Sequence, residues 1–389
     1  MKENRFNRRE FIDKSAKTTL AVGLTFPWIR TKKILASTTH QDGVQAVKTP
    51  TLEFRTLGRT GLKVTTVAYG AMRTREPAVI HRAIDYGLNY IDTAHCYMDG
   101  YNEIVVGKVL KTRRKETFIA TKVHNDSVDK MMASIEASLK SLQTDYVDVI
   151  QLHNLKEVSQ IKDERAMEAL QRMKKEGKAR YIAFTTHRNQ IELIKAAIPM
   201  NFYDVILVAY NFKSPKELGI VIQDAAKAGI GIVGMKTQAG GYQNHKMGNL
   251  SPHQASLKWV LQNPGVATTI PSMVTYGQLD ENIQVMGSKM GWRDRKTLHK
   301  YDQSIDSVFC RMCDDCQGTC PKGVDVLDVN RCLMYAEGYR DTGLAHSQYQ
   351  TIPFAKRPNA CLTCQTCQVT CSYGLNVHAK MKQALKTFA

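Results

Sequence analysis

The sequence has no long uninterrupted hydrophobic run. An apolar stretch near the N-terminus covers residues 18–29 and is broken by Pro27, whereas a helix that crosses a bilayer needs about 20 consecutive apolar residues. We therefore expect no transmembrane span. Motifs typical of nucleic-acid-binding proteins are also missing, and so is any flavin-binding signature.

Glycine-rich phosphate-binding motifs and internal repeats are missing too. The first turn after a predicted strand has no G-x-G-x-x-G, the pattern of doubly wound dinucleotide-binding sheets. No period of 20–50 residues recurs apart from two cysteine runs. A doubly wound sheet is therefore only the alternative fold, and a repeat architecture is not indicated.

What the chain has in excess is positive charge. Its 389 residues include 54 Lys and Arg against 36 Asp and Glu, a net charge of +18. Part of this positive charge lies in residues 1–50. The rest is spread over predicted helices and forms no continuous stripe. Solvated helix faces explain this pattern better than binding to nucleic acid, and we expect no nucleic-acid partner. An acidic partner protein or an anionic substrate stays open.

Cysteine is concentrated near the C-terminus, where eight of the ten cysteines form two runs with the same spacing. Three thiolates at intervals of three residues can bind three irons of a cubane, and in two-cluster ferredoxins the fourth cysteine of each run binds the other cluster. The spacing predicts two [4Fe-4S] clusters. Their expected ligand sets are Cys310, Cys313, Cys316 and Cys371, and Cys361, Cys364, Cys367 and Cys320.

Zinc and disulfide bonds are the alternatives for these cysteines. Zinc sites usually take pairs of cysteines from two separate knuckles. Disulfides are natural in exported proteins, but cysteines this close in sequence have few partners of suitable geometry. With two clusters, residues 300–389 would form a small ferredoxin-like, two-cluster iron–sulfur module.

The N-terminus resembles a twin-arginine export signal. Arg8 and Arg9 are followed by Phe11 and then by the short apolar stretch. We expect a signal segment over residues 1–37, a linker over residues 38–50 and a periplasmic protein, because this route carries folded proteins with their cofactors. Ala36 and Ser37 are candidates for the cleavage site, and retention of the signal as a membrane anchor stays open.

From Thr51 onward, short Val- and Ile-rich runs alternate with amphipathic segments. Eight such units over about 230 residues match the size of a (β/α)8 TIM barrel, so we expect an α/β fold with this barrel over residues 51–295. A hairpin over residues 54–64, turning at Gly58 and Gly61, would close its bottom. The expected strands are 65–69, 90–93, 117–123, 146–153, 180–185, 205–210, 231–236 and 267–270, and the expected helices include 128–142, 166–176, 218–228 and 254–262.

Four polar residues fall at or just beyond the carboxyl ends of the second, third and fourth predicted strands, where barrel enzymes carry their chemistry. They are Asp92, Tyr97, Lys122 and His153. A buried ammonium beside a phenol lowers the pKa of the phenol, and a carboxylate holds the ammonium in place. Tyr97 could then give a proton to a carbonyl oxygen as a hydride arrives, while His153 orients the carbonyl. The set favours the active site of an oxidoreductase.

Four further residues lie near these strand ends. Cys96 is expected to be a small buried filler. His95, His124 and His187 could touch the substrate, but at least two of them are expected on the surface.

These patterns resemble the aldo-keto reductase superfamily over about residues 52–290. Two motifs further along, Phe184-Thr185-Thr186-His187 and Gly234-Met235-Lys236, look more like the subgroup with C-terminal ferredoxin-type clusters. The resemblance implies that Tyr97 is the general acid and base, that Lys122 and Asp92 adjust its pKa, and that His153 orients the substrate. It rests on Arg55-x-Leu57-Gly58-x-x-Gly61-Leu62, Asp92-Thr93-Ala94-x-x-Tyr97, Glu103-x-x-x-Gly107, Ala120-Thr121-Lys122, Leu152-His153, and Ile270-Pro271 with Glu281-Asn282.

Several positions that bind the nicotinamide cofactor in this family differ here. Lys236 stands where an aromatic side chain stacks on the nicotinamide, and Leu207 stands where a glutamine contacts the carboxamide. Ser272 and Gln278 replace the cations that bind a 2′-phosphate, which loses its strongest partner without them. We therefore expect NAD(P)(H) as the cofactor and no preference for NADP, and loss of nicotinamide binding stays open as the alternative. The implied contacts are Thr185, Lys236, Ser272 and Asn282.

The leading hypothesis is a periplasmic oxidoreductase that interconverts a small carbonyl and an alcohol by hydride transfer, coupled to two [4Fe-4S] clusters. Hydride transfer moves two electrons together, whereas each cluster exchanges one, so coupling needs a redox partner protein or a flavin. Two alternatives stay open. The protein could be an electron-transfer protein whose barrel docks or senses, or its clusters could be purely structural.

Overall fold

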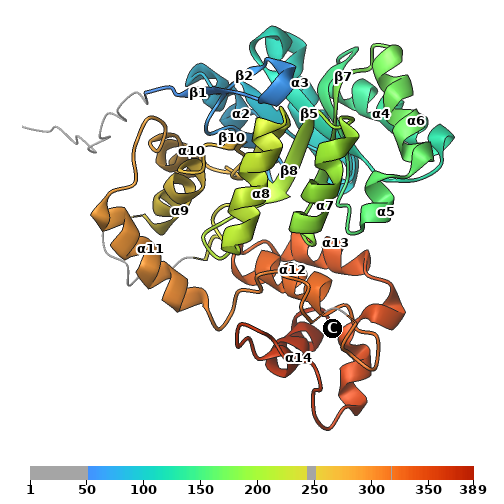
Figure 1. Ribbon diagram of the computed structural model, residues 1–389, viewed down its shortest axis with the longest axis vertical. Coiled ribbons are helices and arrows are strands. Elements are labelled where there is room, and N and C mark those ends of the chain that lie inside the picture. Colours follow the sequence, from blue (N-terminus) through green and yellow to red (C-terminus); the bar gives the residue numbers. More distant parts are fainter. Residues whose placement is uncertain (1–50, 243–250, 317) are drawn as a thin grey trace, which may run out of the picture. The chain divides into compact units, whose positions relative to one another are not determined.

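Eight parallel strands form the centre of the structure, a computed structural model in which residues 51–242, 251–316 and 318–389 are described (Figure 1). Val67 forms a parallel bridge to Thr269 and Gly70 one to Ser272, so the first and last strands meet and the sheet closes into a barrel. The strands follow one another around it as β3 (Tyr69–Gly70), β4 (Tyr90–Asp92), β5 (Phe118–Val123), β6 (Val147–Leu152), β7 (Ala179–Thr186), β8 (Val205–Ala209), β9 (Gly231–Met235) and β10 (Val266–Thr269).

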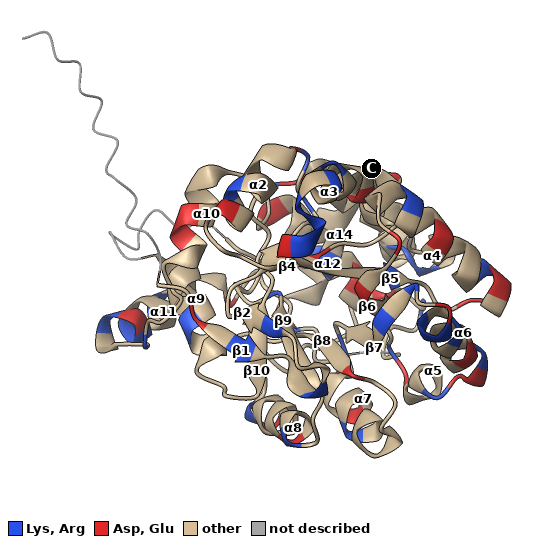
Figure 2. Ribbon diagram, turned by 90° about the horizontal axis from the view of Figure 1, so that it is seen from above, with Lys and Arg blue, Asp and Glu red and all other residues tan. Residues whose placement is uncertain are grey.

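Helices surround the strands in alternation with them, as Figure 2 shows in a view along the barrel. Lys and Arg are interspersed with Asp and Glu on the outer helices, for example on α6 and α11. The helices of the barrel are α2 (Pro77–Asp85), α3 (Tyr101–Arg113), α4 (Val128–Leu142), α5 (Val158–Ile161), α6 (Glu164–Lys175), α7 (Gln190–Ala197), α8 (Lys216–Lys227), α9 (Pro252–Leu261) and α10 (Tyr276–Ile283).

The sequence pattern explains these elements. Every residue of β6, β8 and β9 is buried, as expected for parallel strands covered on both faces. Helix α4 begins and ends at the predicted residues and buries Met131, Ile135 and Leu139 along one side, the spacing of an amphipathic helix. The predicted α/β barrel is confirmed.

A hairpin closes the bottom of the barrel, as predicted. Strands β1 (Phe54–Thr56) and β2 (Lys63–Thr65) are antiparallel. Gly58, with φ of +52°, lies so close to the start of β9 that a Cβ would be 2.2 Å from the Gly231 nitrogen. The first barrel strand differs from the prediction of one strand over residues 65–69. The chain is divided there between β2, which pairs with β1, and the two-residue β3, which pairs with β4.

After the barrel, α11 (Trp292–Ile305) leads into the C-terminal segment, defined here as residues 306–389. It contains α12 (Val326–Glu337), α13 (Thr342–Gln350) and α14 (Val377–Thr387), joined by turns that carry the cysteines. Helix α12 is buried from Val326 to Tyr335 and lies against the end of the barrel where α7 and α8 begin (Figure 1). All the described residues belong to one compact unit.

The predicted signal segment over residues 1–37 and the linker over residues 38–50 lie outside the described residues. Within the described part of the chain, no helix is both long enough and apolar enough to span a bilayer.

Candidate active site

A buried ion pair lies at the carboxyl ends of β4 and β5. Lys122 Nζ is 2.5 Å from Asp92 Oδ1 and donates a second hydrogen bond, of 2.6 Å, to the carbonyl of Thr93. The other carboxylate oxygen of Asp92 accepts a hydrogen bond of 2.7 Å from Gln151 Nε2. Three strands therefore hold one carboxylate and one ammonium in a fixed orientation.

Tyr97 and His153 lie beside this pair. Lys122 Nζ is 4.8 Å from the centre of the Tyr97 ring. The Tyr97 and His153 rings meet edge to face, with centroids 5.9 Å apart. The structure therefore brings together the four residues that the sequence singled out, Asp92, Tyr97, Lys122 and His153.

The protonation of Tyr97 differs from the expectation. Burial raises the pKa of the Tyr97 phenol well above its usual value, and the charge of Asp92 raises it further. The prediction of a lowered pKa was wrong because Lys122 directs its hydrogen bonds to Asp92 and the Thr93 carbonyl. Tyr97 is therefore a neutral phenol in this site, the form that can donate a proton.

His153 is held as a neutral imidazole. Burial lowers the pKa of His153 well below its usual value, and the positive charge of Lys122 lowers it further. Its Nδ1 is 3.4 Å from Cys96 Sγ, and its ring stacks on that of His124 with centroids 5.0 Å apart. Cys96 is therefore a half-buried neighbour of His153, and the prediction of a simple buried filler was wrong.

The other histidines are less exposed than expected. His187 is 9% exposed, and its Nδ1 is 2.9 Å from Asn154 Oδ1. His95 is half-buried, with Nδ1 2.8 Å from the Lys122 carbonyl oxygen. Of the three, His124 alone is exposed. The ligand atoms of Cys96, His124 and His153 lie within 4.8 Å of one another, a set that could bind a transition metal.

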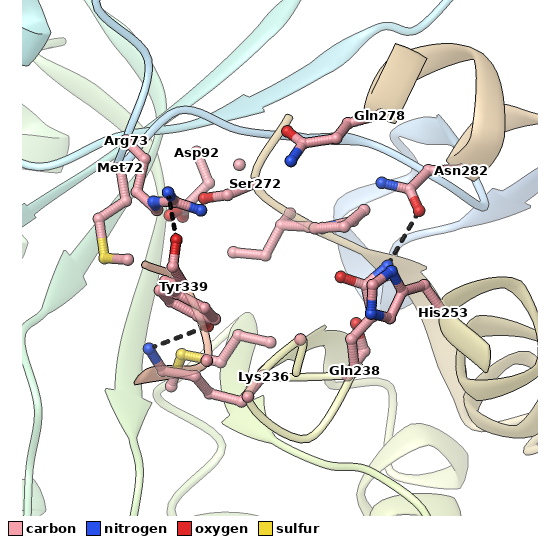
Figure 3. A pocket seen from close by; sticks show the side chains of 18 of the residues that line it. Met72, Arg73, Asp92, Lys236, Gln238, His253, Ser272, Gln278, Asn282 and Tyr339 are labelled. Carbon is pink, nitrogen blue, oxygen red and sulfur yellow. Dashed lines mark hydrogen bonds between the residues drawn. The ribbon is translucent and has the colours of Figure 1, made fainter. Parts of the chain in front are cut away.

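A pocket opens beside Asp92, Tyr97 and His187, and Figure 3 shows part of its lining. Asp92 and Tyr97 line one part of it, and Lys236, Ser272 and Asn282 line another. These last three were predicted to contact the cofactor, and the structure places all of them at the same pocket. Asn282 Oδ1 accepts a hydrogen bond of 2.9 Å from Gln238 Nε2.

Thr185, the fourth predicted cofactor contact, binds the backbone of the protein instead. The buried hydroxyl of Thr185 accepts a hydrogen bond of 2.7 Å from the backbone N–H of Asn154. Leu207, which takes the place of the family's glutamine, is 1% exposed and lies in the barrel core. Neither offers a polar group to the pocket.

Lys236 is bound by two tyrosines that sequence reasoning missed. Its Nζ donates a hydrogen bond of 2.9 Å to the Tyr335 hydroxyl and lies 4.3 Å from the centre of that ring. The Tyr339 hydroxyl is 3.5 Å from the same Nζ. Burial lowers the pKa of Lys236 well below its usual value, and the charges of Arg331 and Arg73 lower it further. Lys236 is therefore not a solvated surface lysine.

The C-terminal segment forms one wall of the pocket. Gly338 approaches the loop after β9 so closely that a Cβ there would be 2.2 Å from the Gly240 carbonyl oxygen. Arg73 binds the next turn through Asp341 Oδ2 at 3.1 Å and the Tyr339 carbonyl at 2.8 Å. No local motif in the sequence marks this wall, because it depends on how α12 packs against the barrel.

The ten cysteines are all free thiols in the structure. Burial raises the pKa of Cys310 to about 12, and the charges of Cys316, Cys313 and Cys371 raise it further. The last of these three belongs to the second run, so the fold brings a distant cysteine to the first run.

The second run is arranged in the same way. Burial raises the pKa of Cys361 to about 11, and the charges of Cys320, Cys364 and Cys367 raise it further. Here Cys320 is the cysteine from the other run. Each of these two thiols therefore has one cysteine of the opposite run among the neighbours whose charge raises its pKa. The two ligand sets stay a prediction from the spacing.

A (β/α)8 barrel with polar side chains gathered at the carboxyl ends of its strands has the architecture of a barrel enzyme. Residues 66–248 match the model of the aldo/keto reductase family. The chain is 30% identical over 250 residues to the methylglyoxal reductase DkgB of Salmonella typhimurium, covering 60% of this chain and 91% of that one. It belongs to the aldo/keto reductase family and is an oxidoreductase of that type.

Two other comparisons agree with this assignment. The chain is 26% identical over 307 residues to the L-galactose dehydrogenase of Arabidopsis thaliana, covering 66% of this chain and 95% of that one. The solved aldo-keto reductase AKR11C1 from Bacillus halodurans superposes with a TM-score of 0.55 at 25% identity, covering 64% of this chain and 96% of that one. The matched family region ends before the cysteine runs begin.

Proposed function

We propose that this protein interconverts a small carbonyl compound and the corresponding alcohol, with a nicotinamide cofactor in the pocket and two [4Fe-4S] clusters in the C-terminal segment. The observation that carries the proposal is the buried Asp92–Lys122 ion pair beneath Tyr97, with His153 beside it. The relatives named above are a reductase of methylglyoxal and a dehydrogenase of galactose, which supports a small carbonyl or alcohol substrate.

The residues of the site divide the chemistry between them. When bound, a reduced nicotinamide supplies the hydride. Tyr97, as a neutral phenol, gives its proton to the carbonyl oxygen as negative charge develops there. His153 offers a ring nitrogen to the same oxygen, and the Lys122 ammonium, held by Asp92, lies 4.8 Å from the centre of the Tyr97 ring.

The pocket supports a nicotinamide cofactor without a 2′-phosphate preference. Asn282, one of the cofactor contacts that the family resemblance implies, lines the pocket together with Ser272 and Gln278. The Gln278 side chain accepts a hydrogen bond of 2.8 Å from the backbone N–H of Val274. A neutral hydroxyl and a neutral amide at these positions offer a dianionic phosphate no ionic partner.

The two cysteine groups support the proposal of two clusters. Thiolates buried together repel one another, as the raised pKa values of Cys310 and Cys361 indicate, and metal ions relieve this by replacing the protons. Four cysteines in each run, with the fourth ligand of each cluster taken from the other run, is the pattern of two-cluster ferredoxins, whereas zinc sites usually take pairs of cysteines from two separate knuckles.

A second function has a specific observation in its favour. Lys236 occupies the position of the aromatic residue expected to stack on the nicotinamide, and its ammonium is bound to Tyr335. An electron-transfer protein with a docking or sensing barrel would not need that stacking. In that case the clusters carry the function alone. The separate alternative, in which the clusters only stabilise the segment, stays open.

We also propose that the chain is exported to the periplasm by the twin-arginine route, from the motif at Arg8 and Arg9. Replacing both by Lys should leave the protein in the cytoplasm, because the export receptor recognises the guanidinium pair. Fractionation of cells that produce the two forms checks this, and export of the double variant would refute it.

The central experiment is anaerobic purification followed by three measurements. Iron and sulfide counting should give about eight of each, since each cubane holds four. Release and identification of small molecules shows whether an organic cofactor is bound. NADH oxidation with methylglyoxal as substrate tests reduction. Zinc in place of iron would refute the clusters, and iron without any nicotinamide-dependent reduction would favour electron transfer.

A further inference from the structure

Three side chains of the kinds that bind transition metals meet at the carboxyl ends of neighbouring strands. Cys96 lies in the loop after β4, His124 directly follows β5, and His153 directly follows β6. One ligand atom from each, the Cys96 sulfur and a ring nitrogen of each histidine, lies within 4.8 Å of the other two. Because β4 pairs with β5 and β5 with β6, the barrel fixes the positions from which the three side chains start.

The spacing of these side chains suits a tetrahedral zinc ion. Cys96 Sγ is 3.4 Å from His153 Nδ1, and a sulfur and a nitrogen bound to one zinc at about 2.3 and 2.05 Å are about 3.6 Å apart. The His124 and His153 rings have centroids 5.0 Å apart, and two imidazoles on one such zinc have their centres about 5 Å apart. Small side-chain movements would therefore bring all three ligand atoms onto one ion.

The donor set and its accessibility also suit zinc. Zinc accepts one thiolate together with two imidazoles, and three protein ligands leave a fourth position for water. His124 is exposed, and Cys96 and His153 are half-buried, so an ion can reach the set from solvent. The neighbouring ammonium of Lys122 is paired with Asp92 at 2.5 Å, which reduces its repulsion of a cation.

A simple hydrogen bond between thiol and imidazole would explain the contact between Cys96 and His153 on its own. It leaves the position of His124 unexplained, because the His124 ring stacks beside His153 with a nitrogen within reach of the same sulfur. A shared metal ion accounts for all three positions together.

We propose that Cys96, His124 and His153 bind one zinc ion, at a site separate from the two cysteine runs. The ion binds His153 through Nδ1, the nitrogen next to the Cys96 sulfur, and this leaves the ring proton on Nε2. His153 then meets the carbonyl oxygen only as a hydrogen-bond donor. This effect of the ion rests on the proposed carbonyl reduction, but the zinc site itself does not.

The first test measures zinc bound to the anaerobically purified holoenzyme after dialysis against Zn²⁺. We expect one zinc ion per chain beside an unchanged iron content. X-ray absorption at the zinc edge should show one sulfur ligand at about 2.3 Å and nitrogen ligands at about 2.0 Å. Cys96→Ser and His124→Gln should each weaken zinc binding by more than about 100-fold, because loss of a residue that only supports a ligand already costs about 10–100-fold.

The matched control is His299→Gln, which removes an exposed histidine of α11 and should bind zinc like the unmodified protein. If Cys96→Ser loses its iron or its cooperative melting, His124→Gln decides by the same criterion, because it changes an exposed side chain. Absence of bound zinc, zinc with four sulfur ligands as in an empty cluster site, or full zinc binding by both variants would overturn the site.

The second test measures KM for methylglyoxal with and without zinc at constant iron content. Removal of zinc with a chelator should raise KM about fivefold, the usual contribution of one hydrogen bond. Added zinc should restore KM in the unmodified protein but not in His124→Gln. An unchanged or lowered KM after zinc removal would overturn the effect on His153. Zinc binding without any carbonyl reduction would refute the reductase activity and this effect with it, and leave the zinc site standing.

Discussion

The barrel and the C-terminal segment are built on different physical principles. The barrel strands bury apolar side chains along their whole length, as in β6, β8 and β9, and such burial stabilises a fold without any ligand. The cysteine runs lie in turns, where Cys367 is exposed and most of the others are half-buried. We expect the barrel to keep its fold without metal, and the turns of the C-terminal segment to depend on it.

Helix α12 connects these two regions and belongs to both. It is buried from Val326 to Tyr335, and the Tyr335 hydroxyl accepts a hydrogen bond from Lys236, which lines the pocket. The comparison therefore teaches that a change in the barrel should leave the cysteine turns intact, whereas a change in the turns should reach the pocket through α12.

The largest effect should be a loss of catalytic rate caused by a substitution in the barrel. Tyr97→Phe keeps the ring and removes the proton, so kcat for carbonyl reduction should fall by about 10²–10⁴-fold, the usual contribution of a positioned acid. Iron content and the melting temperature should not change. Steady-state kinetics with iron analysis checks this, and full activity in the variant would remove the proposed role of Tyr97.

The converse experiment changes the turns. Cys313→Ser should lose one cluster, about half of the iron, because a hydroxyl is a poor replacement for a thiolate ligand. Carbonyl reduction should then fall as well, since the pocket wall depends on α12, while far-ultraviolet circular dichroism should retain the signal of the barrel. Unchanged iron would contradict the assignment of Cys313, and unchanged activity would show that the two regions are independent.

A smaller effect, on thermal stability, should appear where α12 packs against the barrel, and it should depend on pH. Burial would raise the pKa of Asp328, but the charges of Arg331 and Lys156 lower it to about 2. A carboxyl group with an unfolded pKa of about 3.9 then adds stability above pH 4, and this stability is lost as the pH falls from 4 toward 2.

Asp328→Asn should therefore melt at a lower temperature than the unmodified protein at pH 7, and the difference should shrink as the pH falls through this range. Thermal melts at several pH values measure it. A difference in melting temperature that stays constant from pH 7 to pH 2 would show that the charge of Asp328 does not stabilise the folded protein.

The smallest effect should be on the choice between NADH and NADPH, which depends on barrel residues. Because Ser272 and Gln278 offer no cation to a 2′-phosphate, NADH should serve at least as well as NADPH in kcat/KM. Ser272→Arg should shift the ratio toward NADPH, and the exposed Arg172→Gln serves as the control. A clear preference of the unmodified protein for NADPH would show that another cation binds the phosphate.

Much of the barrel and its four central residues could be predicted because the relevant signals are local. The apolar spacing of α4 and the strand-end positions of Asp92 and Lys122 follow from periodicities of about three and a half and two residues. The assignment of Cys320 and Cys371 to the clusters of the opposite runs rests on the spacing of the cysteines and stays a prediction.

The rest depends on tertiary packing that the sequence pattern does not encode. Tyr335 and Tyr339 reach Lys236 because α12 is placed against the barrel, although they lie about a hundred residues away from Lys236 in the chain. The pKa of Tyr97 depends on the degree of its burial, which decides between the opposing effects of desolvation and neighbouring charge.

The contact between Gly338 and the Gly240 carbonyl has a consequence for engineering. Since a Cβ at Gly338 would lie 2.2 Å from that oxygen, the two backbones meet without room for any side chain. The C-terminal segment cannot simply be grafted onto another barrel, because the recipient must also supply a loop after its seventh strand that tolerates this approach. A functional chimaera would have to exchange the loop and the segment together, as a single cassette.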